Sequence, residues 1–301
     1  MQEIQHQTQT HVPSLHPAVE VGTVTLKVAN LERSLKFYTQ VIGLEVFKQD
    51  EHTAVLGAGN RPILLLEEVA GATRLARNVT ALYHAAILFP SRVSLAIKIY
   101  QLVRMNYPFG YGDHLVSEAF YLDDPDGNGL ELYQDRPRST WKWQNGSVQM
   151  ASDPVDMDSL FAEIKPDDPA LNNPAAPAGT KLGHMHLRVG NISKARAFYH
   201  DVLGFDMVAE MPSALFMSAG GYHHHIGMNV WESNGGKPTP ENSAGLREFS
   251  ISLPDPAELD RLTKQIETAG IPVERNGDSA LVLDPFQTRI KLVLQNSLTR
   301  Q

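Results

Sequence analysis

The chain has 301 residues, a net charge of −8 and no cysteine. Its composition, 42% hydrophobic and 20% charged, is typical of a folded protein with room for two domains. The negative charge argues against nucleic-acid binding, which needs a basic surface, and the lack of cysteine excludes disulfides and thiolate metal sites. Any bound metal would therefore take nitrogen and oxygen ligands.

The first residues carry neither the basic start nor the apolar core of a signal peptide. We expect residues 1–19 to form a flexible polar tail, in which His6, His11 and His16 are solvated. The chain also has no apolar run long enough to span a bilayer. These features predict a cytoplasmic protein with no membrane or nucleic-acid partner.

An internal repeat organises the chain. Residues 28–46 (VANLERSLKFYTQVIGLEV) align without gaps to residues 189–207 (VGNISKARAFYHDVLGFDM). In both copies an alternating strand leads to an asparagine in an N-cap position, Asn30 or Asn191, and then to an amphipathic helix that ends at a glycine. Each copy therefore predicts a strand, a helix and a further strand.

A weaker repeat relates the segment from Leu82 to the segment from Leu246. Both end in a strand, an Asp-Pro turn at position 124 or 284, and a last strand. The sequence thus predicts four copies of a βαβββ unit, which we number modules 1 to 4. Modules 1 and 2 occupy residues 20–136 and modules 3 and 4 residues 181–297, separated by a linker over residues 137–180.

One such module exposes the concave face of a small sheet, so two modules must pair to close a cup. Strand alternation predicts which side chains enter each cup. Modules 2 and 3 would contribute His84, His184 and Glu131. At the matching places modules 1 and 4 carry Thr23, Glu248 and Lys291.

The lysine decides between the two cups, because an ammonium group repels a dication. Glu248 and Lys291 could instead neutralise each other. We therefore expect a metal between modules 2 and 3. Two histidines and one carboxylate that leave open positions are typical of non-haem Fe(II) oxygenases.

Each ligand also has a structural interpretation, since a single histidine in a half-buried strand is more often a hydrogen-bonded core residue. Three such residues at equivalent places of a repeat favour the metal site. Alternation also turns His186 toward the cup, where it could be a partner of a metal ligand or an ordinary strand residue, and we favour the second interpretation.

The repeat architecture resembles the vicinal oxygen chelate superfamily, which includes glyoxalase I, bleomycin-resistance proteins and extradiol dioxygenases. The resemblance covers about residues 20–135 and 180–296. It implies an α+β fold in which four βαβββ modules form two vicinal oxygen chelate domains, an N-terminal one at 20–136 and a C-terminal one at 181–297.

The stretch from Gly112 to Glu131 is similar to the signature of the extradiol ring-cleaving dioxygenases. It contains Gly-x-His, then Phe-Tyr, an Asp-Pro turn, a glycine and a glutamate. The resemblance implies that Glu131 binds the metal and that His114 and Tyr121 contact the substrate. This sequence departs from many two-domain extradiol enzymes, which place all metal ligands in the C-terminal half. Here the signature lies in module 2, so the metal site must bridge the two halves, within one chain or between subunits.

A run of three histidines precedes the last strand of module 3. Alternation places His223 and His225 on one face and His224 on the other. Extradiol enzymes carry a similar histidine pair whose second member is the acid–base residue, which implies His225, with His224 as the alternative. Asn229 and Trp231 are expected to line the pocket.

The resemblance implies Fe(II)-dependent extradiol cleavage of catechol or a substituted catechol with O₂ to a 2-hydroxymuconic semialdehyde. Mn(II) is the alternative metal, and we expect a homo-oligomer. A metal-dependent lyase or isomerase of the glyoxalase or epimerase type is a second interpretation, although such enzymes usually add a further protein ligand. A non-catalytic, drug-sequestering protein is a third, and it would need no ligand triad.

Overall fold

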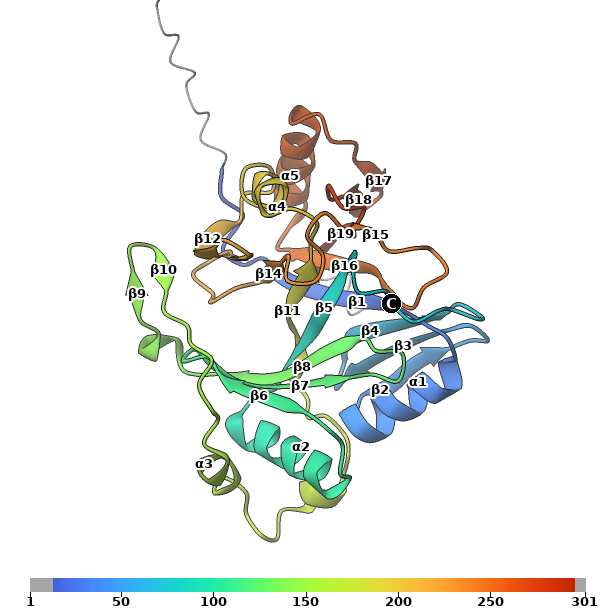
Figure 1. Ribbon diagram of the computed structural model, residues 1–301, viewed down its shortest axis with the longest axis vertical. Helices are drawn as coiled ribbons and strands as arrows, with labels where there is room; N and C mark the ends of the chain where they lie inside the picture. The colour runs from blue at the N-terminus through green and yellow to red at the C-terminus, as the bar shows by residue number, and fades with distance from the viewer. Residues whose placement is uncertain (1–12, 296–301) are drawn as a thin grey trace, which may run out of the picture.

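The computed structural model describes residues 13–295 and contains the four predicted modules, each a strand, a helix and three strands (Figure 1). Module 1 consists of β1 (Glu20–Val28), α1 (Leu31–Phe37), β2 (Glu45–Gln49), β3 (Thr53–Ala58) and β4 (Arg61–Glu68). Module 2 consists of β5 (Val79–Leu88), α2 (Arg92–Arg104), β6 (Gly110–Asp113), β7 (Ser117–Asp123) and β8 (Gly129–Asp135).

The second half repeats this order. Module 3 consists of β11 (Lys181–Arg188), α4 (Ile192–Tyr199), β12 (Asp206–Met211), β13 (Ala214–Ser218) and β14 (Ile226–Asn229). Module 4 consists of β16 (Gly245–Leu253), α5 (Pro256–Thr268), β17 (Glu274–Asn276), β18 (Ser279–Leu283) and β19 (Arg289–Leu294). A two-residue strand, β15 (Lys237–Pro238), pairs with β5.

The modules pair across the two halves of the chain. Modules 1 and 4 form one sheet in the order β17-β18-β19-β16-β1-β4-β3-β2. Modules 3 and 2 form the other in the order β12-β13-β14-β11-β5-β8-β7-β6. The first strands of paired modules, β1 with β16 and β5 with β11, run antiparallel. The pairing of module 2 with module 3 therefore occurs within one chain, and each half contributes to both sheets.

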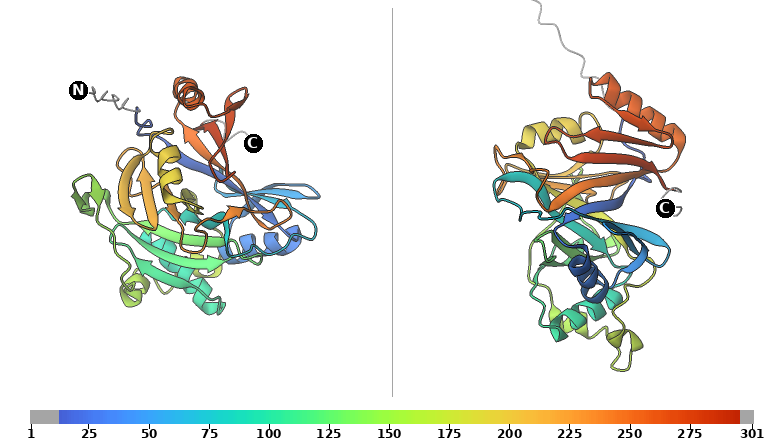
Figure 2. Two further views of the ribbon diagram at one scale, coloured as in Figure 1. Left: turned by 45° about the horizontal axis from the view of Figure 1, so that its top comes forward. Right: turned by 90° about the vertical axis from the view of Figure 1, so that its right-hand side faces the viewer.

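The helices cover the outer faces of these sheets. In Figure 1, α1 and α2 lie together below the strands while α4 and α5 lie above them, and Figure 2 shows the same separation from two other directions. Val24, Leu26 and Val28, which alternate along β1 and so share one face, are buried in the main core.

Local sequence explains where the first helices of each half begin. Oδ1 of Asn30 accepts the Arg33 N–H at 2.8 Å, and Oδ1 of Asn191 accepts the Lys194 N–H at 2.9 Å. Both asparagines are thus N-caps, as the sequence predicts. Gly43, which ends the first helical segment after a π-helical turn at Tyr38–Ile42, has the left-handed φ of 92° that favours glycine.

A repeated hydrogen bond joins the two modules within each half. The Tyr38 hydroxyl donates to Oδ2 of Asp124 at 2.9 Å, and the Tyr199 hydroxyl donates to Oδ2 of Asp284 at 3.0 Å. Tyr38 and Tyr199 occupy equivalent positions in the aligned segments 28–46 and 189–207, and the aspartates belong to the two Asp-Pro turns of the weaker repeat. Sheet pairing therefore joins modules across halves, and these bonds join them within halves.

The described part of the predicted tail is not free. Leu15 is buried and its N–H donates to the Gly204 carbonyl at 2.8 Å, while the His16 N–H donates to Oε1 of Glu258 at 3.1 Å. Residues 13–19 are therefore fixed to modules 3 and 4, which corrects the predicted boundary of the tail. His6 and His11 lie outside the described residues.

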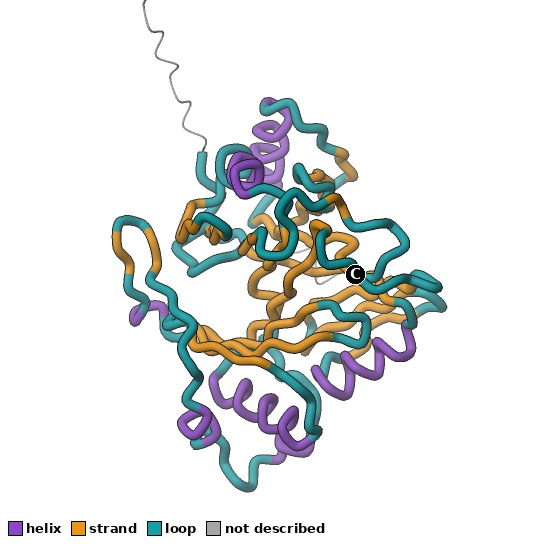
Figure 3. The backbone as a smooth tube through the Cα atoms, viewed as in Figure 1, coloured by secondary structure: helices purple, strands orange, loops and turns teal. Residues whose placement is uncertain are grey.

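The linker contains structure of its own. It forms the hairpin β9 (Trp143–Gln144) and β10 (Ser147–Val148), seen at the left of Figure 3, and the short helix α3 (Met157–Phe161). Between them, Asp153 exchanges two backbone hydrogen bonds with Asp113 at the end of β6, at 2.8 and 3.0 Å. Over residues 13–295 no helix has the length and apolarity needed to cross a bilayer.

Candidate metal centre

Three neighbouring strands bring His84, Glu131 and His184 together. The central strand is β5, which carries His84, with β8 and β11 on its two sides. Glu131 on β8 and His184 on β11 both lie opposite Ala86 of β5, two residues from His84 and on the same face. The small Ala86 side chain leaves the space between the larger groups open.

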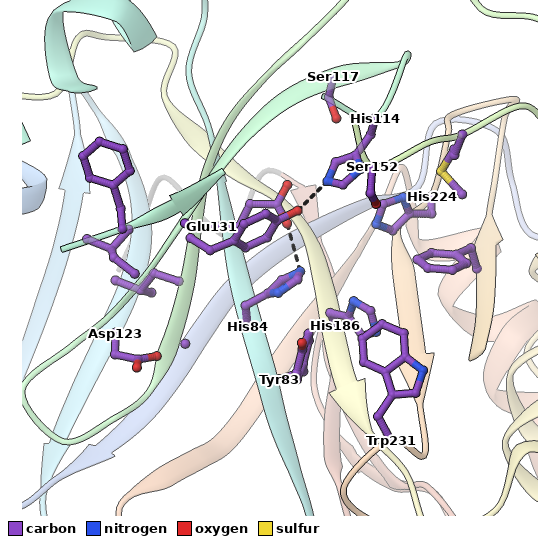
Figure 4. A pocket seen from close by; sticks show the side chains of 18 of the residues that line it. Tyr83, His84, His114, Ser117, Asp123, Glu131, Ser152, His186, His224 and Trp231 are labelled. Carbon is purple, nitrogen blue, oxygen red and sulfur yellow. Dashed lines mark hydrogen bonds and ion pairs between the residues drawn. The ribbon is translucent and has the colours of Figure 1, made fainter. Parts of the chain in front are cut away.

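The three ligand atoms converge in a buried place. Nε2 of His84 lies 2.9 Å from Oε2 of Glu131, and Nε2 of His184 lies 3.1 Å from the same oxygen. All three atoms lie within 4.8 Å of one another. Figure 4 shows His84 and Glu131 pointing toward each other.

The geometry fits a divalent cation. Nε2 of His84 is buried without a hydrogen-bond partner, although Glu131 is close. Ligands about 2.1 Å from a metal and at right angles to each other stand about 3 Å apart, which matches the two separations. Two imidazoles and one carboxylate suit iron, manganese or zinc, and leave further positions open.

The electrostatics also favour metal binding. Burial by itself would raise the pKa of Glu131, but the adjacent imidazoles of His184 and His84 outweigh it and hold this pKa well below its usual range. Burial lowers the pKa of His184. Glu131 is therefore ionised and His184 neutral, the forms that ligate metals.

His114 and Tyr121 form a hydrogen-bonded pair beside the triad. Nε2 of His114 lies 2.6 Å from the Tyr121 hydroxyl, and Nδ1 lies 2.7 Å from the Ala151 carbonyl. A carbonyl only accepts, so Nδ1 carries the proton and Nε2 of a neutral ring accepts from the tyrosine. Burial, and then the charge of Glu131, raise the pKa of Tyr121, which keeps the phenol protonated.

The histidine run differs from the prediction. His224 lines the same cavity as His84 and Glu131, and its ring centroid lies 4.1 Å from that of His184, with the two rings tilted by 50°. His225 lines a different cavity, and its Nδ1 accepts the Ala219 N–H at 3.2 Å. His224 and His225 point to opposite sides, as strand alternation predicts. The histidines precede β14, however, and it is His224 whose side chain points toward the metal centre. The expected position of His225 beside the metal centre is therefore wrong, and His224, the alternative, lies there instead.

The cavity above the triad measures about 1110 Å³ and is mostly apolar. Trp231 lines it as expected, but Asn229 lies behind the wall, where its side-chain amide contacts Nε2 of His186 at 3.0 Å. His186, interpreted from sequence as an ordinary strand residue, faces the cavity and packs against Trp231 and Tyr83 (Figure 4). Its spacing of two residues from His184 was the available signal for this placement.

The linker also contributes to the site, which sequence reasoning missed. Met150, Ala151 and Ser152 line the cavity, and the Ala151 carbonyl orients His114. The sequence of this stretch carries no signal that would reveal its position, because the contact depends on pairing between Asp153 and Asp113.

The second cup holds no comparable group. Over residues 13–295, His84, Glu131 and His184 form the one cluster of three or more potential ligands. Glu248 lies 3.6 Å from the Arg289 guanidinium, so the expected neutralisation by Lys291 is wrong in its partner. Arginine offers no lone pair to a metal, and its positive charge beside Glu248 opposes cation binding at that carboxylate.

Comparisons with known proteins agree with this architecture. The family model described as "Glyoxalase/Bleomycin resistance protein/Dioxygenase superfamily" matches residues 20–132 and 181–290. A Bacillus subtilis (strain 168) protein named catechol-2,3-dioxygenase is 44% identical over 277 residues, which cover 90% of this chain and 96% of the relative.

Solved structures share the fold at low sequence identity. Glyoxalase I from Zea mays aligns with a TM-score of 0.55 and 17% identity, covering 94% of this chain and 95% of that one. The cppA protein from Streptococcus pneumoniae TIGR4 aligns with a TM-score of 0.52 and 10% identity, covering 91% and 98%. At these identities the similarity shows the fold alone.

Proposed function

This chain belongs to the glyoxalase, bleomycin-resistance protein and dioxygenase superfamily, and from that premise we propose that it is an extradiol dioxygenase that cleaves catechol or a substituted catechol with O₂. One observation carries the proposal: a buried triad of two histidines and one glutamate opens onto a cavity that also holds His114 and Tyr121. The 44% identity to a protein named catechol-2,3-dioxygenase supports the same reaction.

The metal in this proposal is Fe(II), held by His84, His184 and Glu131. A bound ferrous ion would bring the diol and O₂ together and conduct electrons between them. Mn(II) is the alternative, since the same donor set suits both ions. The apolar walls of the cavity would surround the aromatic ring of the substrate and exclude water from it.

The surrounding side chains would transfer protons and form hydrogen bonds to the substrate. Nε2 of His224 would take the proton of a catechol hydroxyl and return it later, acting as a general base and then as an acid. Burial lowers the pKa of His224, which favours the neutral ring that can accept this proton. The Tyr121 hydroxyl gives its one hydrogen to Nε2 of His114, so its oxygen would accept a hydrogen bond from a substrate hydroxyl. His114 would hold that phenol in place through its own bond to the linker.

Anaerobic reconstitution tests the proposal. The chain is loaded with Fe(II), catechol and air are added, and a yellow ring-opened product is expected. Glu131→Gln should lose both iron and turnover, because it removes the negative charge of the carboxylate that lies beside both histidines.

Lys291→Ala is the matched control, since Lys291 occupies the equivalent position of the other cup. This variant should keep wild-type iron content and turnover. Stoichiometric, tight iron binding by Glu131→Gln would contradict the proposed ligand set, and a wild-type chain that holds iron but leaves catechol intact would contradict the reaction.

A further inference from the structure

We propose that Asp135 and His223 are positioning residues that orient His224 through two consecutive hydrogen bonds, so that Nε2 of His224 presents a lone pair to the metal cavity. The geometric part stands on its own contacts. Its catalytic consequence rests on the proposed function.

The chain of contacts starts at the last residue of β8. Oδ1 of Asp135 lies 2.8 Å from Nε2 of His223, and Nδ1 of His223 lies 2.8 Å from Nδ1 of His224. Asp135 lines the separate cavity that also contains His225, while His224 lines the metal cavity. The fully buried His223 ring therefore connects the two cavities.

The chemistry of the acceptor at one end sets the proton positions along the chain. A carboxylate only accepts, so Nε2 of His223 carries a hydrogen, and in the tautomer with a single ring hydrogen its Nδ1 has a lone pair. The contact to His224 is then a hydrogen bond only if Nδ1 of His224 is the donor. That leaves Nε2 of His224 unprotonated, and over residues 13–295 this atom has no hydrogen-bond partner in the protein.

Packing holds the middle ring in this orientation. The ring centroid of His223 lies 4.2 Å from that of Tyr222, 5.2 Å from that of Trp141 and 4.7 Å from that of His224. A ring enclosed in this way cannot rotate to exchange its two nitrogens without moving its neighbours. Trp141 belongs to the linker, which thus supports the chain as well as His114.

The arrangement matters because a neutral imidazole has two tautomers. A His224 with its hydrogen on Nε2 could not accept a proton from a substrate in the cavity. A carboxylate that fixes a histidine tautomer in this manner is a known device, and its replacement by an amide can leave the geometry intact while the rate falls. Loss of Asp135 should therefore lower turnover without removing the metal.

The test uses the full-length chain and two readouts. Asp135→Asn and His223→Gln each interrupt this series of hydrogen bonds. Asp135→Asn removes the carboxylate charge, while His223→Gln keeps a donor toward Asp135 but removes the ring nitrogen Nδ1 that contacts His224. Tyr222→Phe is the matched control, because the Tyr222 hydroxyl makes a separate hydrogen bond to Oδ1 of Asp135 at 3.2 Å. This control removes a partner of the same carboxylate and leaves the contact to His223.

In the Fe(II)-loaded protein, both interrupting variants should lower kcat about 10- to 100-fold with KM and iron content little changed, a magnitude typical of lost ligand-orienting partners. Tyr222→Phe should stay close to wild type. In the Zn(II)-loaded protein, ¹⁵N shifts of the His224 ring should show the Nδ1–H tautomer in wild type and Tyr222→Phe, and a mixture in the two interrupting variants.

A wild-type His224 that carries its hydrogen on Nε2, or a tautomer unchanged in His223→Gln, would overturn the proposal. The wild-type nitrogen shifts need neither a substrate nor a variant, so they decide the proposal even if a variant folds poorly or the wild type fails to open catechol. Absence of ring cleavage with the expected tautomer would count against the proposed function alone.

Discussion

His224 and His225 are adjacent in the chain yet face different cavities, and this difference gives a direct prediction. His224→Ala should lower kcat at least about 100-fold, as expected for loss of a general base, while iron content stays normal. His225→Asn should keep near-normal turnover, because asparagine can still accept the Ala219 N–H. Steady-state rates and metal analysis of both variants provide the measurement, and a larger loss in His225→Asn would reverse the assignment.

At the scale of single residues, the sequence identified the ligand triad but not all of its surroundings. Strand alternation placed His84, His184 and Glu131 on one face, which the structure brings together. Alternation alone could not decide which face of the histidine run meets the metal, because His224 lies just before regular strand pairing begins. It also could not place the Ala151 carbonyl, which comes to His114 from the linker.

At the scale of elements, Gly183 sits where β11 shifts register against β5. A Cβ at this position would collide with the buried hydroxyl of Tyr133, a rigid ring that cannot move aside. Gly183→Ala should therefore lower the free energy of unfolding by about 2 kcal/mol, as overpacking does. Gly110→Ala is the control, because a Cβ there meets nothing within 4 Å. Urea unfolding of the two variants checks this, and equal midpoints would contradict it.

Helix α2 carries a buried lysine that should make stability depend on pH. Lys98 donates to the carbonyls of Val41 at 3.2 Å and Pro174 at 2.9 Å, and burial lowers its pKa to about 8. The unfolded chain, with a lysine pKa near 10.5, therefore binds more protons between these values. Stability should rise as the pH increases from about 8 toward 10.5, by up to about 3 kcal/mol.

Other groups titrate in the same range, so the effect of Lys98 must be isolated. The wild type is compared with Lys98→Met, which removes the titration and keeps an unbranched side chain that is one atom shorter. The difference in unfolding free energy between the two proteins should shift in favour of wild type as the pH rises from 8. A difference that stays constant with pH would show that Lys98 has the same pKa in both states.

At the scale of the whole molecule, each half lacks the partners for its own first strands. Strands β1 and β5 both belong to the N-terminal half and pair with β16 and β11 of the C-terminal half. Residues 1–136 expressed alone should therefore fail to form a stable monomer, because two apolar sheet edges would lie open. Coexpression with residues 137–301 should restore a compact complex that binds Fe(II), as judged by size-exclusion chromatography and metal analysis.

A soluble, folded monomer of residues 1–136 would contradict this interlocked arrangement. A homodimer of the fragment would be compatible with it, since two copies could complete each other's edges.

The sequence predicted most of this global arrangement. The repeats fixed the order of elements, the N-caps Asn30 and Asn191, and the pairing of module 2 with module 3. Local patterns could not show that residues 13–19 are anchored, because that depends on distant groups such as the Gly204 carbonyl and Glu258. The contacts of the linker could not be predicted either. Its pairing with β6 and the packing of Trp141 on His223 arise only from the tertiary fold.

The crossing of modules between halves also has a consequence for synthesis. While the ribosome is still making the linker, β1 and β5 have already emerged, and neither has its partner strand. The nascent chain must keep both edges unpaired until β11, and later β16, leave the exit tunnel. The proposed metal ligand His184 arrives with β11, so the three proposed ligands cannot meet before translation is past the middle of the message.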